Sequence, residues 1–146
     1  MSNIKGITIE EIKYIAHELA IKTMNWDEPI PEFETRYPNA LESCIAVPFM
    51  KFDKKFLYKG LVGKAAILFY LLIKNHPFQN GNKRMAVTSL FVFLYIKNNK
   101  WLEVDTKVLY RTAVWVAESP AEAKDEVVEY LIKFINKFLV DGLLLK

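Results

Sequence analysis

Two long apolar stretches separated by one short polar segment constrain the fold of this chain most strongly. The stretches run from Leu61 to Ile73 and from Met85 to Ile96, and neither contains a proline. Neither shows the alternation of apolar and polar residues that is typical of a half-buried strand. We therefore expect two buried central helices, over 59–74 and from Asn80 to about residue 97, with Asn80 as the N-cap of the second.

Capping signals predict further helices on both sides of this pair. Thr8 and Glu11 form a capping-box pattern, so a helix should begin after Thr8. Asp105 is a candidate N-cap for a helix that ends near residue 118. Ser119, with Pro120 after it and Glu122 at the third helical position, predicts the start of a last helix whose apolar stripe extends to Leu139.

The remaining segments have other signals. Three prolines make 25–38 a loop, because each proline lacks a backbone donor and restricts φ. A short helix is expected over 39–47. Segment 48–58 alternates aromatic and charged residues, which suits an exposed hairpin or flap. Residues 101–104 read as a brief extended linker.

The expected fold class is therefore all-α: a helical bundle around a central helix-loop-helix, with a small β-hairpin flap and a single domain over 1–146. Hydrophobic content of 52% and charged content of 25% are ordinary for a globular protein. No apolar run reaches the roughly 18 residues of a membrane span. One cysteine, Cys44, suits a reducing cytoplasm and a buried position. With a net charge of +3 and scattered cations, no nucleic-acid partner is expected.

The polar segment between the central helices has the composition of an anion site. The backbone amides of Gly81, Asn82, Lys83 and Arg84 would lie at a helix N-terminus, where unpaired donors favour an anion. Gly81 would let a phosphate approach closely. Asn82 could bridge phosphate and backbone, Lys83 would add a point charge, and Arg84 could bind two phosphate oxygens.

His76 is the candidate general base, because the ordinary pKa of histidine lies near neutrality. Its place before Pro77 should hold its backbone extended, and Phe78 could anchor the loop in the core. A lone histidine is more often structural, and Asn80-Gly81 is also a common hairpin turn, although the helical neighbours argue against a hairpin here. His17 is expected to be a solvated helix residue.

The nine residues His76-Pro77-Phe78-Gln79-Asn80-Gly81-Asn82-Lys83-Arg84 resemble the Fic-family signature H-P-F-x-D/E-G-N-G/K-R at eight positions. Lysine at the eighth position is most similar to the Doc (death-on-curing) branch. Two further segments are similar to Doc proteins, Leu41-Glu42-Ser43 and the stretch from Lys64 to Asn75. The resemblance extends over about residues 8–100.

This resemblance implies a Fic fold and a transferase that modifies a Ser, Thr or Tyr hydroxyl of a target protein, a translation factor being one candidate. It implies that His76 deprotonates the target, that Gly81, Asn82, Lys83 and Arg84 hold the phosphates of ATP, and that the flap at 48–58 aligns the target. Lysine at position 83 favours a Doc-type kinase that transfers the γ-phosphoryl group. The alternative is Fic-type adenylylation (AMPylation).

Asn80 departs from the family pattern, which has an acidic metal ligand at this position. A neutral amide binds Mg²⁺ more weakly than a carboxylate does, so a catalytically weak binding module is a third interpretation. The inhibitory pattern S/T-x-x-x-E-G/N of many Fic proteins is absent, since no glutamate precedes Gly or Asn. The resemblance thus implies a toxin restrained in trans by an antitoxin protein.

Other conspicuous residues have structural interpretations. Six aromatic residues at core spacings are expected to pack in the interior: Phe91, Phe93, Tyr95, Trp101, Tyr110 and Trp115. Lysines in the flap are expected to be solvated surface residues.

Overall fold

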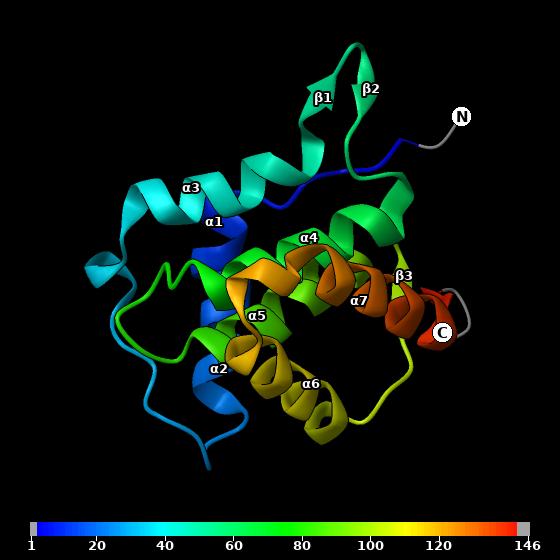
Figure 1. The fold of residues 1–146 in the computed structure, drawn as a ribbon. Helices are drawn as coiled ribbons and strands as arrows, with labels where there is room; N and C mark the ends of the chain where they lie inside the picture. Colours follow the sequence, from blue (N-terminus) through cyan, green and yellow to red (C-terminus); the bar gives the residue numbers. More distant parts are fainter. Residues whose placement is uncertain (1–2, 143–146) are drawn as a thin grey trace.

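The computed structural model describes residues 3–142 and shows a mostly helical protein built around a central helix pair (Figure 1). The first helix of the pair is α4 (Gly60–Lys74), and the second is α5 (Asn82–Phe91), which continues into a π-helical segment, η4 (Val92–Ile96). Residues 63–73 of α4 are all buried. A helix that is apolar on every side must be enclosed by the others, which confirms the predicted all-α bundle.

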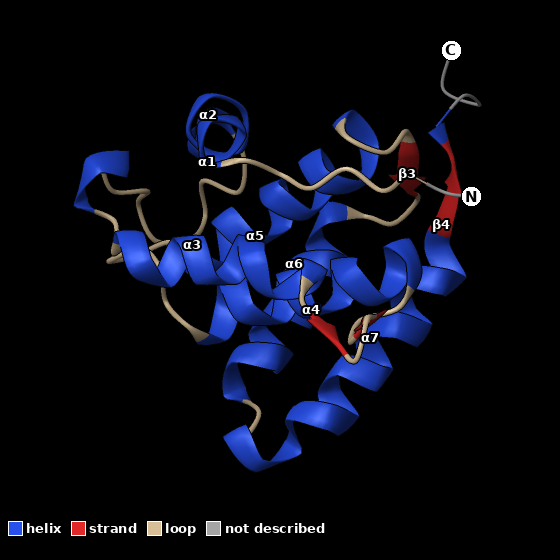
Figure 2. Ribbon diagram, turned by 90° about the horizontal axis from the view of Figure 1, so that it is seen from above, coloured by secondary structure: helices blue, strands red, loops and turns tan. Residues whose placement is uncertain are grey.

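The N-terminal helix begins as predicted. The Glu11 amide donates to Thr8 Oγ1 at 3.1 Å, and the Thr8 amide donates to Glu11 Oε1 at 2.9 Å, which completes the capping box. The helix runs through α1 (Ile9–Glu11), the π-helical segment η1 (Ile12–Ala16) and α2 (His17–Lys22). Figure 2 looks almost along the axis of this rod.

A small hairpin follows a short helix, as expected. Two short 3₁₀ segments flank this helix, α3 (Pro38–Ala46): η2 (Phe33–Thr35) and η3 (Val47–Phe49). Strands β1 (Lys51–Phe52) and β2 (Lys55–Phe56) then pair antiparallel, with Lys51 opposite Phe56. Asp53 and Lys54 both have positive φ, which matches the right-handed twist of a two-residue hairpin. The hairpin projects away from the bundle (Figure 1).

The C-terminal part adds two helices and a second strand pair. Helix α6 (Thr106–Glu118) begins at the predicted cap, where Asp105 Oδ1 accepts from the Lys107 amide at 2.8 Å. It is followed by η5 (Ala121–Ala123) and α7 (Lys124–Phe138). The predicted linker forms strand β3 (Lys100–Leu102), which pairs with β4 (Leu139–Asp141). Leu139 is therefore the first residue of a strand, and the prediction of a helix there was wrong.

Two predicted caps were also wrong. Ser119 ends α6 instead of starting the last helix, because its hydroxyl donates to Val116 O at 2.6 Å. Its own carbonyl accepts from Lys74 Nζ at 2.5 Å. Asn80 does not cap α5, whose N-cap is Gly81 with φ +72°. In both cases the helix begins later in the chain than predicted, by one residue at α5 and by several residues at α7.

Two side chains lie in environments opposite to those predicted. His17 is buried, with 7% of its surface exposed, and its Nε2 lies 2.8 Å from Pro31 O. Its ring contacts Phe33 edge-on, with 5.7 Å between centroids. Trp115 is 45% exposed and does not lie in the core. The expected core position is correct for Phe93, whereas Phe91, Tyr95, Trp101 and Tyr110 are partly buried.

The turn at residues 97–99, just after the central pair, forms hydrogen bonds with residues near both ends of the described chain. Lys97 pairs with Glu11 at 2.5 Å, and the side-chain amide of Asn98 exchanges two hydrogen bonds with the backbone of Lys5. The carbonyl of Asn99 accepts from the Gly142 amide at 2.9 Å. Within residues 3–142, no helix combines the length and the hydropathy that a bilayer crossing requires.

Candidate active site

The loop between α4 and α5, residues 75–81, lies on the left of the molecule in Figure 1, and His76 is its second residue. The helix ends at Lys74, and the Asn75 amide still donates to Leu71 O at 2.9 Å. His76 follows with φ +47°, a left-handed conformation in place of the extended one that was predicted. It occupies the position after a helix C-cap where a left-handed residue commonly ends the helix. Its side chain is exposed, and no hydrogen bond to it occurs among residues 3–142.

A reciprocal clamp closes the loop. The Phe78 amide donates to Asn82 Oδ1 at 2.9 Å, and Asn82 Nδ2 donates to Phe78 O at 2.9 Å. The Phe78 ring is 2% exposed and packs against Phe33, with 6.0 Å between ring centroids. On the other side, Pro77 O accepts from the Tyr37 amide at 2.8 Å. The Asn82 side chain therefore positions the loop through its oxygen and its amino group, which leaves at most one of its two N–H donors for a phosphate.

Gly81 sits where only glycine fits without rearrangement. Its φ of +72° is a left-handed conformation, and a Cβ at this residue would lie 2.6 Å from Ile30 Cδ1. The Gly81 carbonyl accepts from the Met85 amide at 2.9 Å, which is the first turn of α5. Ile30 is a contact that sequence reasoning missed, since nothing local in the sequence places residue 30 beside residue 81.

The first turn of α5 leaves three backbone donors open. Glycine at the N-cap has no side chain to accept from them, and no acceptor for the amides of Asn82, Lys83 or Arg84 occurs among residues 3–142. Lys83 is partly exposed, and within the same residues its ammonium has no ion pair. Open amides at a helix N-terminus, with a cation beside them, favour an anion such as a phosphate group.

Arg84, by contrast, faces the interior. Its side chain is 3% exposed and donates to four acceptors of segment 20–28: the carbonyls of Ala20, Thr23 and Glu28 and the side chain of Asn25. The guanidinium therefore does not reach the mouth of the loop, where the sequence suggested a phosphate contact. It ties the end of α2 and the following loop to the start of α5, and only its backbone amide remains for an anion.

Asn80 offers one neutral oxygen at this site. It is partly buried, and no hydrogen bond to its side chain occurs among residues 3–142. Within the same residues, no group of three His, Cys, Asp or Glu side chains is close enough to hold a metal ion. Mg²⁺ usually binds through one or two carboxylates together with substrate phosphates. The residues present therefore do not form a protein-held Mg²⁺ site.

Two other titratable groups near this region stay protonated. Burial raises the pKa of the Cys44 thiol to about 12, although a hydrogen bond with Asn75 partly opposes this. Cys44 is therefore no nucleophile at neutral pH. Burial also raises the pKa of the Tyr110 hydroxyl, and a hydrogen bond with the Asp27 carboxylate raises it further. Neither group can act as the base, which leaves His76 as the candidate.

The hairpin lies at the opposite end of α4 from the loop at 75–81 (Figure 1). Since α4 has 15 residues, the two ends are about 22 Å apart. Lys64 anchors the hairpin: its buried ammonium donates to Tyr58 O at 2.7 Å and lies 3.8 Å from the centre of the Phe56 ring. A target that pairs with the hairpin and reaches His76 would need about seven extended residues to span α4.

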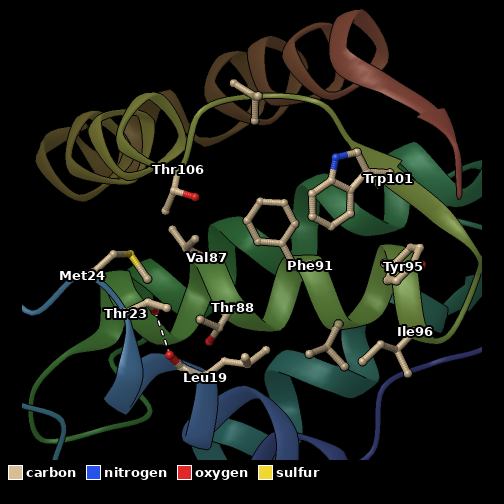
Figure 3. Close-up of a pocket in the computed structure, with 12 residues that line it drawn as sticks. Leu19, Thr23, Met24, Val87, Thr88, Phe91, Tyr95, Ile96, Trp101 and Thr106 are labelled. Atoms are coloured by element: carbon tan, nitrogen blue, oxygen red, sulfur yellow. Dashed lines mark hydrogen bonds between the residues drawn. The ribbon is translucent and has the colours of Figure 1, made fainter. Parts of the chain in front are cut away.

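An apolar cavity of about 290 Å³ lies along α5. Figure 3 shows Val87, Phe91 and Trp101 around it, together with the Thr23 hydroxyl, which donates to Leu19 O at 2.7 Å. The Thr88 hydroxyl is likewise directed to helix carbonyls, Arg84 O and Met85 O, both at 3.3 Å. Because its lining is mostly apolar and carries no charged side chain, this cavity does not contribute to an anion site.

The clamped loop carries an exposed imidazole, and the start of α5 carries three open amides and a lysine with no ion pair in residues 3–142, groups that could bind an anionic ligand and accept a proton beside it. The sequence matches the Fic/DOC family over residues 6–94, more than half of the 146 residues. The chain therefore belongs to the Fic/DOC family, whose members are typically transferases that modify other proteins. No curated protein matches the chain significantly, and neither does any solved structure.

Proposed function

We propose that this protein transfers the γ-phosphoryl group of ATP to a hydroxyl group of a target protein, with His76 as the general base. The observation that carries this proposal is the combination of an exposed His76, whose side chain has no hydrogen-bond partner in residues 3–142, with open amides at residues 82–84.

The transfer step can be written in terms of this chain's residues. The imidazole of His76 accepts the proton of the target hydroxyl as its oxygen bonds to the γ-phosphorus. The bond from the γ-phosphorus to the β–γ bridging oxygen breaks, and ADP leaves with that electron pair. The amides of residues 82–84 and the ammonium of Lys83 would stabilise the charge on the phosphates. The products are a phosphoester on the target, ADP and protonated His76.

The γ-phosphorus is favoured over the α-phosphorus by the side chain at position 83. By resemblance to the family, a glycine there leaves room for the phosphate orientation that adenylylation needs, whereas a lysine side chain at position 83 would crowd that orientation. Lys83 is partly exposed and unpaired in the described part of the chain, so it is available to a phosphate. Mg²⁺ would arrive with ATP, held by the phosphates, and Asn80 would contribute at most one neutral oxygen.

By the same likeness to the Doc branch, we propose that the protein acts as a toxin in the cytoplasm and is restrained by a separate antitoxin. The target would present a Ser, Thr or Tyr hydroxyl on a segment long enough to extend from the hairpin to His76. A disordered antitoxin segment that folds as it binds could cover the same path.

Labelled ATP tests the proposal. The protein is incubated with a cytosolic extract and ATP labelled at either the γ- or the α-phosphate, and label on protein is measured. We expect γ-label on a target protein. Transfer of α-label instead would mean adenylylation. Absence of both labels, with ATP still bound, would mean a binding module, and either of these results would overturn the proposed phosphotransfer.

The role of His76 is tested by His76→Asn. Asparagine tolerates the left-handed conformation, so the loop should keep its shape while the base is lost. We expect labelling to fall by roughly 10²- to 10⁴-fold, as for loss of a general base, with ATP affinity retained. The control is Gln79→Asn, an exposed residue of the same loop, which should label like the wild type. Unchanged labelling by His76→Asn would remove His76 from the mechanism.

A further inference from the structure

Two large aromatic side chains lie together on the surface of α6 and α7. Trp115 is 45% exposed and Tyr130 is 48% exposed, and their ring centroids are 4.8 Å apart. Burying an exposed tryptophan and tyrosine is a large source of binding energy, and both residue types are enriched where protein interfaces are strongest. Both residues lie outside segment 6–94, over which the chain matches its family, so family membership assigns them no role.

The aromatic pair separates two open hollows. One, of about 420 Å³, is lined by Arg111, by Thr112 and by aliphatic and aromatic residues of both helices. The other, of about 520 Å³, is lined by Glu118, Glu126 and residues of the turn between α6 and α7. The surface is therefore a ridge of two rings with a basic hollow on one side and an acidic hollow on the other.

The charged residues along α6 also change from basic to acidic across the aromatic pair. Lys107, Arg111, Trp115 and Glu118 are all exposed, and their spacing of four, four and three residues places them on one face. In residues 3–142 no ion pair involves Arg111 or Glu118. Cations near the N-terminus of a helix and anions near its C-terminus oppose the helix dipole. This order therefore gives the isolated helix no stabilisation.

An antiparallel copy of the same helix would make this order favourable. Arg111 lies four residues before Trp115 and Glu118 lies three residues after it. A two-fold axis beside Trp115 would therefore place Arg111 opposite Glu118 of the second copy, and the reverse pair would form by symmetry. These charges pair with the same charges of an antiparallel copy. Binding of an unrelated protein would not require such a self-complementary pattern.

We propose that this face, defined by Arg111, Trp115, Glu118 and Tyr130, binds a second copy of the chain in a two-fold symmetric dimer with antiparallel α6 helices. Contact between the aromatic rings supplies most of the binding energy, and the two Arg111–Glu118 pairs set the register. The hairpin and the loop at 75–81 lie on other elements and take no part in this contact.

Sedimentation velocity over a range of micromolar concentrations tests the dimer. We expect the wild type to dimerise, and Trp115→Ala to raise the dissociation constant at least roughly tenfold, as for loss of an interface hot spot. Arg111→Glu and Glu118→Arg should each be monomeric, because each homodimer would bring two pairs of like charges together. Circular dichroism checks that every variant is folded.

Mixing the two charge variants is the decisive measurement. The Arg111→Glu variant carries carboxylates at both positions, and the Glu118→Arg variant carries guanidinium groups at both. Every carboxylate of one therefore faces a guanidinium of the other in a heterodimer, so we expect dimers to form again in the mixture. The controls are Glu18→Arg and Lys22→Glu, exposed charges on α2 with the same sign changes, which should dimerise like the wild type.

Three results would overturn the proposal. The wild type could stay monomeric at the highest concentration, the single charge variants could dimerise as strongly as the wild type, or the mixture could remain monomeric. Binding of a different protein at this face without self-association would count against it as well.

Discussion

Lys83 and Arg84 are neighbours in the chain and have opposite environments. The Lys83 ammonium is partly exposed with no ion pair in the described residues, and the Arg84 guanidinium is buried among four acceptors. A helix places consecutive side chains about 100° apart, so one can face the loop while the next faces the core.

This difference predicts separate effects of two matched substitutions. Lys83→Met should weaken ATP binding and change the free energy of unfolding by no more than about 0.5 kcal/mol, as for a surface site. Arg84→Met should lower that free energy by about 3 kcal/mol or more, because buried carbonyls lose their donor. Urea unfolding and titration with ATP measure the two quantities. If Lys83→Met destabilised the fold as much as Arg84→Met, the assignment of the two cations would fail.

Gly81 and Gly60 form a second matched pair. Both have positive φ, +72° and +65°, but a Cβ at Gly81 would lie 2.6 Å from Ile30 Cδ1, whereas nothing lies within 4 Å at Gly60. Gly60→Ala should therefore lower the free energy of unfolding by only about 1–2 kcal/mol, the penalty of a left-handed alanine. Gly81→Ala should lower it further and also weaken ATP binding, because the start of α5 must move. Equal losses measured by urea unfolding would show that the Ile30 contact adds nothing.

At the scale of elements, the hairpin depends on a side chain of the helix that follows it. Burial lowers the pKa of the Lys64 ammonium, whose contacts are the Tyr58 carbonyl and the rings of Phe56 and Phe49. A cation over an aromatic ring and a hydrogen bond contribute together about 1–3 kcal/mol in such surroundings. The sequence contained no sign of this anchor, because a lysine near a helix start is normally solvated.

We therefore expect Lys64→Met to loosen the hairpin more than the bundle. Hydrogen exchange of the Leu57 amide, which donates to Met50 O at 3.1 Å, should become about tenfold faster or more. Exchange within α4 should change less, since removing a buried charge also removes its desolvation penalty. The control is Lys59→Met, an exposed lysine just before α4. An unchanged rate at Leu57 would show that Lys64 does not hold the hairpin.

At the scale of the whole molecule, the Glu11–Lys97 pair joins the N-terminal helix to the end of the central pair. Burial alone would raise the pKa of the Glu11 carboxyl, but the hydrogen bonds from Lys97 and Thr8 and the charge of Lys97 outweigh it. The net pKa lies below the ordinary value of 4.5. A carboxyl whose pKa is lower in the folded state contributes stability above 4.5 and loses it as the pH falls through the lowered pKa.

Glu11→Gln should therefore destabilise the protein near neutral pH, and the difference from the wild type should shrink as the pH falls below 4.5. Urea unfolding at several pH values measures it. Glu10→Gln removes an exposed neighbouring carboxyl with no ion pair in residues 3–142 and controls for the loss of a negative charge. A difference that stays constant with pH would mean that the pair contributes nothing specific.

Much of the architecture could be predicted from local pattern. The capping box at Thr8, the cap at Asp105, the hairpin and the two buried helices depend on residues within a few positions of one another. The N-cap of α5 was predicted one residue too early, because both Asn80 and Gly81 are residue types that commonly cap a helix. Only the backbone geometry distinguishes them.

The sequence by itself determined the helices, the polar loop and the presence of His76 and Lys83 in that loop, since these follow from spacing along the chain. Tertiary structure alone decided the surroundings of Arg84, His17 and Trp115. Arg84 binds carbonyls more than 50 residues earlier in the chain. The pairing of β3 with β4 joins residues 37 to 41 positions apart. Contacts between such distant segments form only when the helices pack, because no local rule states which face of each helix its neighbours will cover.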